Sequence, residues 1–421
     1  MAKFNKQLST LAQKPTQRDV IQRFYKSKFI YMEEKMTFKM WFTLIGLTFC
    51  TFIFNTSEFI PVGLLTDIAK DFDLTEAGAG MLISVYAWMV MLLSLPLMVM
   101  TSKMELKRLM LILVGLFTVF QVCSFLSTSY AMLMFSRIGV ACTHAIFWSI
   151  VSPLAVKLVP QRFHAVALST IVTGSSIAMI LGMPLGRLIG LMLGWRMTFL
   201  SIGIFSFISL IYISFTLPKV QSDGKFSMSQ VPVLLKNKAL VTIYILALTI
   251  PMAHYTGYGY IEPFLLKVAN LGESAITTLL MIFGIAGFGG SILFAKYYNK
   301  NTTVFNYISM IALTVSLLLF KLSSQDISTT LIVLIVWGIS MTAFNVAMQA
   351  EIIERSPKAG TAVSMSIFSG IYNLGIGCGT FVGGEVCLYL GIPFIGYIGA
   401  IIAIFAIVLL KTGVLSLPAR K

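Results

Sequence analysis

The chain has 421 residues, of which 57% are hydrophobic and only 11% are charged. A water-soluble protein of this size needs roughly 25% charged residues to cover its surface, so the composition argues against a soluble globular fold. A net charge of +15 is compatible with nucleic-acid binding, but the basic residues follow the apolar segments instead of forming one patch. The sequence therefore indicates a membrane protein.

Twelve apolar segments predict twelve transmembrane helices. Charge-free intervals such as 77–102 and 239–261 are long enough to cross a bilayer, which takes about 20 helical residues. A β-barrel would need short strands of alternating polarity, whereas these segments are continuously apolar over several helical turns. The predicted spans are 41–64, 78–101, 108–127, 131–155, 164–190, 197–217, 240–262, 274–297, 303–321, 328–350, 360–388 and 392–411.

The basic residues predict the orientation of these helices. One side of the predicted membrane carries 25 of the 31 Lys and Arg residues, against Lys70, Lys267 and Lys321 on the other. Basic loops stay in the cytoplasm, so both termini are predicted to be cytoplasmic. The expected regions are a cytoplasmic tail (1–39), a six-helix bundle (40–217), a cytoplasmic linker (218–238) with a short surface helix over 229–238, a second bundle (239–411) and a C-terminal tail (412–421).

The N-terminal tail has an alternative explanation. Translation that starts at Met32, Met36 or Met40 would leave residues 1–39 outside the native protein. The first apolar segment follows about 39 polar and basic residues, so no secretory signal peptide is predicted.

An internal repeat divides the predicted helices into two halves of six. Three glycines recur at an offset of 197 residues, in the pairs Gly182 and Gly379, Gly186 and Gly383, Gly194 and Gly391. Spans 1 and 7 align when Pro61 is matched with Pro263. Two parallel six-helix halves with both termini inside are typical of secondary transporters of the major facilitator type, an all-α fold of two pseudo-symmetric bundles.

Ionisable side chains within spans are the first functional candidates, because a charge in hydrocarbon costs about 2.5–3.5 kcal/mol on insertion scales. Burial of the span-1 carboxyl Glu58 would favour loading and release of protons near neutral pH. Arg137 and His144 lie seven residues apart on one face of span 4, so they are candidates to tune that proton site. Two alternatives remain open: Glu58 meets water or an arginine near the outer membrane surface, and the span-4 residues form a purely structural network.

Neutral polar and aromatic residues are the candidates for substrate binding. The repeat places Leu334 and Met341 where the first half has Arg137 and His144, which suits proton handling in one half and hydrogen bonding to a ligand in the other. The substrate candidates are Asn55, Trp88, Trp148, His254, Tyr255, Tyr258, Asn345, Gln349 and Asn373. The competing explanations are polar contacts that hold helices together and an aromatic belt at the membrane interface.

Span 5 carries a glycine-rich stretch that predicts close helix packing. Gly182, Pro184, Gly186 and Gly194 permit close approach of two backbones, which indicates a sliding interface between the halves. Arg187 is expected near the outer surface as a packing or gating contact. The five cysteines lie in apolar spans without a CxxC pair and are expected to be packing residues. Metal-ligand spacings, phosphate loops and nucleophile–base patterns are absent from the sequence, so neither catalysis, a metal nor a cofactor is predicted.

Several segments together resemble the sugar efflux transporters of the arabinose and isopropyl-thiogalactoside type, in the twelve-span drug:proton antiporter branch of the major facilitator superfamily. The resemblance extends from residue 40 to about 410 and is carried by Asn55-Thr-Ser-Glu-Phe-Ile-Pro-Val-Gly-Leu-Leu, Ser136-Arg-Ile-Gly-Val-Ala, His144-Ala-Ile-Phe-Trp-Ser-Ile, Gly182-Met-Pro-Leu-Gly-Arg, Gly194-Trp-Arg-Met-Thr-Phe, Ala253-His-Tyr-Thr and Tyr260-Ile-Glu-Pro-Phe. It implies proton-driven export by alternating access. Arg137 matches the superfamily's span-4 arginine, and the 182–194 segment is similar to its antiporter motif. The 2–3 loop departs from the pattern, because the expected acidic residue before the basic pair is missing and Glu105 is its candidate substitute.

We therefore predict proton-coupled efflux of sugars or sugar-like glycosides across the plasma (inner) membrane of a bacterium. The expected partners are protons, the substrate and the bilayer, with no nucleic acid, and the expected form is a monomer. Export of drugs or purine nucleosides is the alternative within the same mechanism. A non-transporting receptor or scaffold is the alternative of another class, and it would not require ionisable residues within spans.

Overall fold

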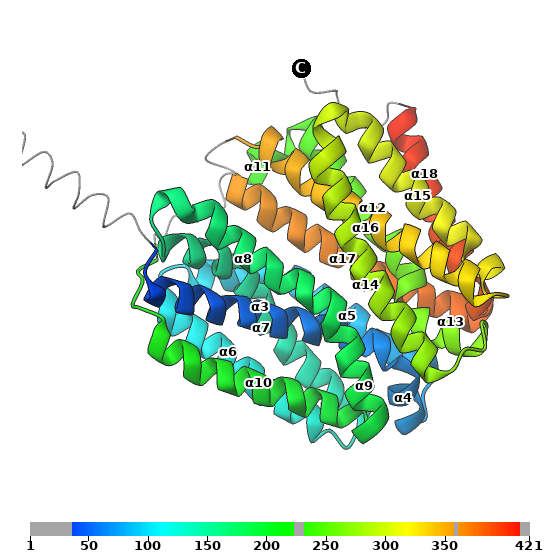
Figure 1. The fold of residues 1–421 in the computed structure, drawn as a ribbon, viewed down its shortest axis with the longest axis horizontal. Helices are drawn as coiled ribbons and strands as arrows, with labels where there is room; N and C mark the ends of the chain where they lie inside the picture. Colours follow the sequence, from blue (N-terminus) through cyan, green and yellow to red (C-terminus); the bar gives the residue numbers. More distant parts are fainter. Residues whose placement is uncertain (1–35, 223–230, 358–360, 413–421) are drawn as a thin grey trace, which may run out of the picture.

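The computed structural model describes residues 36–222, 231–357 and 361–412 of the chain. Twelve helical segments in this part of the chain are long and apolar enough to cross a membrane, and their bounds agree with the predicted spans to within a few residues. The predicted all-α fold with twelve spans is thus confirmed (Figure 1). Most of the N-terminal tail, the C-terminal tail beyond residue 412 and part of the linker lie outside the described residues.

The first bundle contains six spans. They are α3 (Phe38–Gly63), continued by α4 (Leu65–Asp71); α5 (Glu76–Thr101); α6 (Leu106–Phe125); α7 (Tyr130–Lys157); a fifth span made of η1 (Gln161–Phe163), α8 (His164–Ile177), the π-helical turn η2 (Ala178–Gly182) and α9 (Met183–Leu193); and α10 (Trp195–Thr216). Side-chain oxygens of Thr37, Thr75 and Ser129 accept backbone N–H groups at the starts of α3, α5 and α7, which satisfies donors that a helix leaves free.

The second bundle repeats this order. Its helices are α12 (Lys238–Tyr258), continued by α13 (Ile261–Lys267); α14 (Glu273–Tyr297) with η4 (Tyr298–Lys300); α15 (Thr302–Ser323); α16 (Ile327–Arg355); α17 (Thr361–Tyr389); and η5 (Ile392–Phe394) with α18 (Ile395–Lys411). The linker contains the short helix α11 (Val231–Leu235), inside the predicted surface helix. Gly194 and Gly391 precede the last span of each half with φ of 92° and 94°, a region that glycine adopts without strain. The repeat therefore extends to the backbone conformation.

In one place the structure corrects the repeat alignment. Spans 1 and 7 each break before a seven-residue helix, at Leu64 (φ −124°, ψ 16°) and Tyr260 (φ −121°, ψ 20°). Leu65 therefore corresponds to Ile261, and the match of Pro61 with Pro263 is wrong, because the two prolines lie on opposite sides of the break. Proline was a poor marker here since transmembrane helices tolerate it at many positions.

The two bundles lie side by side, with the first at the lower left of Figure 1 and the second at the upper right. Helices α5 and α17 pack against each other across the boundary, as do η2 and α9 against α14. Helices α4 and α13 lie at one end of the molecule, called here the α4–α13 end, and α11 lies at the other, the linker end. The ribbons of the two halves approach at the α4–α13 end and diverge toward the linker end.

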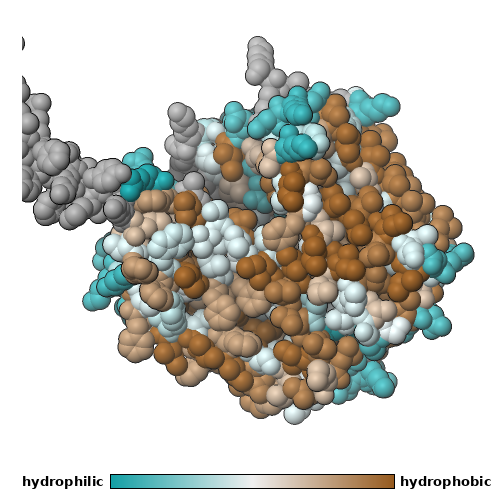
Figure 2. Space-filling model, in the orientation of Figure 1, coloured by the Kyte–Doolittle hydropathy of each residue, from teal (hydrophilic) through white to brown (hydrophobic). Residues whose placement is uncertain are grey.

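The lateral surface suits a lipid environment. Apolar side chains cover most of the face seen in Figure 2, while hydrophilic ones gather at its edges. Large apolar residues such as Phe205, Phe207, Ile208 and Val172 are more than a third exposed, which would be costly in water and is favourable in hydrocarbon. The chain is a multi-pass membrane protein.

Candidate functional site

A buried polar cluster occupies the first bundle where α3, α5, α6 and α7 meet. Arg137 of α7 is fully buried, and its Nη1 donates to Ser57 Oγ of α3 over 3.2 Å. Its guanidinium carbon lies 4.5 Å from the centroid of the Tyr86 ring on α5. Among the described residues no carboxylate pairs with Arg137, and its Nε and Nη2 have no hydrogen-bond partner. A hydroxyl and an aromatic face therefore hold this cation.

Glu58 and His144, two of the predicted proton-site residues, lie close together beside this cluster. Glu58 Oε2 lies 3.5 Å from His144 Nε2, and His144 is 1% exposed. The same Nε2 accepts the indole N–H of Trp148 over 2.6 Å. A nitrogen that accepts carries no proton, so this hydrogen bond assigns a neutral imidazole with its proton on Nδ1. Glu58 and His144 are thus close neighbours without forming an ion pair.

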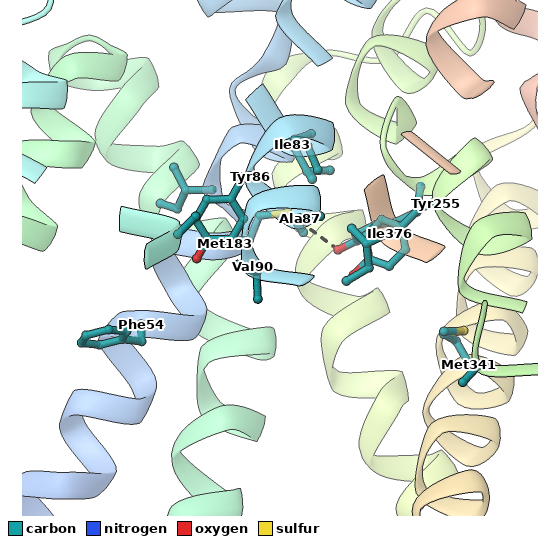
Figure 3. Packing of buried hydrophobic residues seen from close by; sticks show 14 of the residues in the cluster. Phe54, Ile83, Tyr86, Ala87, Val90, Met183, Tyr255, Met341 and Ile376 are labelled. Atoms are coloured by element: carbon teal, nitrogen blue, oxygen red, sulfur yellow. Dashed lines mark hydrogen bonds between the residues drawn. The ribbon is translucent and has the colours of Figure 1, made fainter. Parts of the chain in front are cut away.

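The Glu58 side of the first bundle faces the second. The Tyr86 ring lies edge-on to the His144 ring, with centroids 5.7 Å apart. Figure 3 shows Tyr86 on α5 between Phe54 of α3 and Tyr255 of the second half. The proton-site candidates therefore lie near the contact between the halves.

A central cavity lies at that contact. Phe59, Met179 and Met183 line it from the first half, and the second half contributes His254, Tyr255, Tyr258, Phe283, Gly284, Gly287, Gly338, Met341 and Thr342. The Tyr258 hydroxyl contacts the Met183 sulfur across the boundary at 3.8 Å. No lining residue in the described part of the chain carries a carboxylate, an ammonium or a guanidinium group. The cavity is aromatic and apolar, with a few hydrogen-bonding groups.

Three predicted substrate residues, His254, Tyr255 and Tyr258, line this cavity. Asn345 and Gln349 lie on α16 and are hydrogen bonded to each other at 3.2 Å. This hydrogen bond lies within one helix, and neither residue belongs to the cavity lining.

The remaining substrate candidates also lie outside the cavity lining. Trp88 packs on α17, with its ring 5.8 Å from that of Phe381. The Asn373 amide donates to the Ser369 carbonyl at 2.9 Å, and Asn55 lies buried on α3, three residues before Glu58. Trp148 contacts His144, as described above. The structure thus gives Trp88, Trp148 and Asn373 packing or positioning contacts.

Arg187 joins the two halves at the α4–α13 end. It is 1% exposed, donates to the carbonyl of Gly63 at the end of α3, and pairs with Glu262 of α13 at 3.2 Å between Nη1 and Oε1. It also pairs with Glu273 in the first turn of α14. Glu262 Oε2 in turn accepts the Thr66 hydroxyl at 2.8 Å. These five residues are called the Arg187 network, and Lys267 with Glu76 adds a third ion pair between the halves.

The span-5 glycines pack differently from the prediction. A Cβ at Gly182 or Gly186 would collide with Thr56 or Ile60 of α3, so these glycines join helices of the same half and not the two halves. Contact across the boundary uses the π-helical turn η2, whose Met179 carbonyl would lie 2.5 Å from a Cβ at Gly284 of α14. The turn directly precedes α9, where Pro184 lacks an N–H and so favours an irregular ladder.

Glu105, the proposed substitute in the 2–3 loop, has a local role in the structure. Its Oε1 accepts the backbone N–H of Lys107 at 3.2 Å and that of Val220 at 3.1 Å. It therefore caps α6 and holds the start of the linker.

Sequence reasoning missed several residues of these sites. Trp337 donates its indole N–H to His254 Nδ1 at 2.8 Å, and Ser57 and Tyr86 hold Arg137. Phe59, Phe283 and the cavity methionines were missed as well. Apolar and aromatic residues are abundant in every span, so composition and spacing gave no signal that separates these from lipid-facing ones.

Known proteins share this fold. The profile of the Major Facilitator Superfamily matches residues 47–365. A bacterial homolog of the human lysosomal transporter Spinster, inward-facing and unoccupied, has a TM-score of 0.72 at 14% identity over 88% of this chain and 96% of that one. A mutant of the nucleoside transporter NupG has a TM-score of 0.71 at 14% identity, over 86% of this chain and 97% of that one. A POT family transporter in complex with 5-aminolevulinic acid has a TM-score of 0.71 at 13% identity, over 90% of this chain and 98% of that one. The chain belongs to the Major Facilitator Superfamily and is a membrane transporter, not an enzyme.

Proposed function

We propose that this transporter exports sugars or sugar-like glycosides in exchange for protons. The observation that carries the proposal is the division of chemistry between the halves. The first half buries Glu58 against His144. The second supplies most of an uncharged cavity that includes His254 and two tyrosines. A coupled exchanger needs both a protonatable group and a substrate site, and the two lie on either side of one boundary.

The positive-inside rule supports the proposed orientation of the protein in the membrane. Because 25 of the 31 Lys and Arg residues are on the side of the linker and termini, the linker end is assigned to the cytoplasm. With this orientation the Arg187 network lies at the outer end, and its ion pairs between the halves support an inward-facing arrangement. The Spinster homolog, which is inward-facing, resembles it with a TM-score of 0.72. We expect a monomer in the plasma membrane of a bacterium.

Glu58 is the proposed proton carrier. It binds a proton when the outer end is open and releases it when the linker end is open. His144 lies 3.5 Å away and receives the proton whenever Trp148 leaves its Nε2. Arg137 carries a positive charge in the same bundle, and this charge stabilises the Glu58 carboxylate after the proton has left.

The cavity favours particular glycosides. Its hydrogen-bonding side chains are His254, Tyr255, Tyr258 and Thr342, and the rest of its lining is apolar or aromatic. A free sugar needs hydrogen bonds around its whole ring, because each unpaired hydroxyl in a dry site costs about 1–3 kcal/mol. A glycoside with an apolar aglycone, such as isopropyl-thiogalactoside, matches this mixture better.

Export of apolar drugs or nucleosides is the second candidate, and the methionines of the cavity favour it. Met179, Met183 and Met341 present flexible thioethers, which adapt to ligands of different shape. Stacked rings of His254, Tyr258 and Phe283 would also accept a nucleobase.

Counterflow in proteoliposomes tests these proposals. Arabinose, isopropyl-thiogalactoside, a purine nucleoside and a cationic dye are compared with and without an imposed proton gradient. We expect isopropyl-thiogalactoside to be transported best, with uptake that responds to the gradient. Glu58→Gln should abolish the response to the gradient and leave part of the exchange. Transport of the dye alone would reject the glycoside proposal, and an unchanged gradient response in Glu58→Gln would remove Glu58 from the coupling mechanism.

A further inference from the structure

A buried tryptophan fixes the chemistry of one cavity residue. Trp337 of α16 is fully buried, and its Nε1 donates to His254 Nδ1 over 2.8 Å. Because Nδ1 accepts this hydrogen bond, it carries no proton, and the imidazole is neutral with its proton on Nε2. His254 can therefore donate only from the other edge of its ring.

Aromatic contacts hold that ring in place. His254 stacks on Tyr258 with centroids 4.8 Å apart and an interplanar angle of 20°. Tyr255 and Trp337 contact it edge to face, at 4.7 and 5.6 Å. Rotation of the imidazole would break the bond to Trp337 and disturb all three contacts, so the donor has one orientation.

The Nε2 atom of His254 is the ring nitrogen that remains available to a ligand in the cavity. His254 lines the cavity, and the described residues provide no hydrogen-bond partner for its Nε2. A hydrogen bond from an unpartnered donor to a ligand acceptor contributes more free energy in an apolar surrounding than it would in water. Around it the lining offers Tyr258, Phe283 and Met341, which suit a flat or apolar group.

We propose that Trp337 is a positioning residue that makes His254 a fixed hydrogen-bond donor for an uncharged substrate. This substrate carries an acceptor oxygen or nitrogen next to a flat or apolar group. The inference rests on the proposed transport function and narrows its substrate class: glycosides with an apolar aglycone and nucleosides fit. A cationic drug does not, because it would meet an N–H donor and no carboxylate in the lining.

The test combines a spectroscopic measurement with ligand binding, both on the purified full-length chain in detergent. Nitrogen NMR of protein labelled at its three histidines reports which ring nitrogen of His254 carries the proton, with signals assigned through His144→Gln and His164→Gln. Binding of isopropyl-thiogalactoside and of a cationic dye is measured at equilibrium, without a proton gradient. The variants are Trp337→Phe, which keeps a ring but loses the N–H, His254→Leu, which removes the donor, and His254→Gln, which keeps one.

We expect wild-type His254 to carry its proton on Nε2 and Trp337→Phe to show a mixture of both forms. Affinity for isopropyl-thiogalactoside should fall about tenfold in Trp337→Phe and His254→Leu, the loss expected for one hydrogen bond in a dry site, and recover most of the way in His254→Gln. Trp195→Phe is the matched control, because the buried Nε1 of Trp195 has no hydrogen-bond partner. It should bind like the wild type.

Three results would overturn the inference: a proton on Nδ1 of wild-type His254, unchanged affinity in both Trp337→Phe and His254→Leu, or tighter binding of the dye than of the glycoside. These outcomes are separate from a failure of proton coupling. The protonated nitrogen is read without substrate or gradient, so a chain that transports without protons would still test the role of Trp337.

Discussion

Arg187 of α9 and Glu262 of α13 form an ion pair between the two halves in which both side chains are buried, at 1% and 2% exposure. Each also has a second anchor in its neighbourhood, the Gly63 carbonyl for Arg187 and the Thr66 hydroxyl for Glu262. Separating a buried pair leaves charges without partners, which costs about 3–5 kcal/mol. The Arg187 network therefore stabilises the contact between the halves at the α4–α13 end, and the alternating access proposed above requires that this contact break during transport.

Glu262→Gln should shift the chain away from this closed arrangement. The substitution removes one carboxylate from a buried guanidinium, and we expect the closed state to lose about 3 kcal/mol, since Glu273 still partners Arg187. Distances between spin labels at Asp73 and Ser274, in a cysteine-free background, should then show a larger population separated at the α4–α13 end.

Glu273→Gln is the matched control for that shift. Glu273 is 47% exposed, and an exposed ion pair contributes about 1 kcal/mol or less. Its effect on the label distances should be clearly smaller. Equal effects of the two substitutions would contradict a special role for the buried carboxylate.

Trp148→Phe should alter the coupling of exchange to pH. In the wild type the Trp148 indole N–H donates to His144 Nε2 over 2.6 Å and so competes with a proton for that nitrogen. Glu58 of α3 lies 3.5 Å from that nitrogen, and the Tyr86 ring of α5 lies edge-on to the imidazole at 5.7 Å. Without the indole donor His144 binds a proton more easily, so the pH at half-maximal counterflow should rise. Trp88→Phe, at a tryptophan that contacts no histidine in the described part of the chain, should move this midpoint less. An unchanged midpoint in Trp148→Phe would show that His144 does not titrate during exchange.

Gly284→Ala should hinder closure at the α4–α13 end. The added Cβ would lie 2.5 Å from the Met179 carbonyl oxygen and 2.9 Å from the Ile180 Cα of the other half, and a backbone cannot yield as a side chain does. Overpacking of this kind costs about 1–3 kcal/mol, which predicts a drop in counterflow of roughly five- to a hundredfold if closure limits turnover. Gly370→Ala is the control, because nothing lies within 4 Å of a Cβ there. Wild-type rates in Gly284→Ala would show that close packing of the halves at this contact does not limit exchange.

Arg137→Lys should impair transport more than it impairs folding. Lysine keeps the charge but loses the planar group that lies 4.5 Å from the Tyr86 ring centroid and reaches Ser57. Such a contact is worth about 1–2 kcal/mol in a dry site. We expect counterflow to fall at least about tenfold while thermal unfolding shows a folded protein. Arg196→Lys, at a partly exposed arginine that lies 4.3 Å from the Trp195 ring centroid, should retain most activity. Equal losses in the two variants would point to a general need for arginine.

The fold and the protonatable residues were accessible from sequence because they follow from local rules. Twelve apolar segments, the charge asymmetry of the loops and the exceptional charges in spans each depend on the cost of placing one residue in lipid. Glu58, Arg137 and His144 could be found in this way, and so could the glycine pair Gly194 and Gly391, because the same backbone conformation recurs in both halves.

Partnerships between distant residues depended on the tertiary structure. Sequence placed Arg187 near the outer surface but did not pair it with Glu262, and it gave no reason to single out Trp337 beside His254. The free-energy cost of placing a side chain in lipid depends on that residue alone, so it can be read from the sequence. Hydrogen bonds, ion pairs and stacked rings depend on how helices far apart in sequence are rotated and placed against one another, and only the packed bundle decides that.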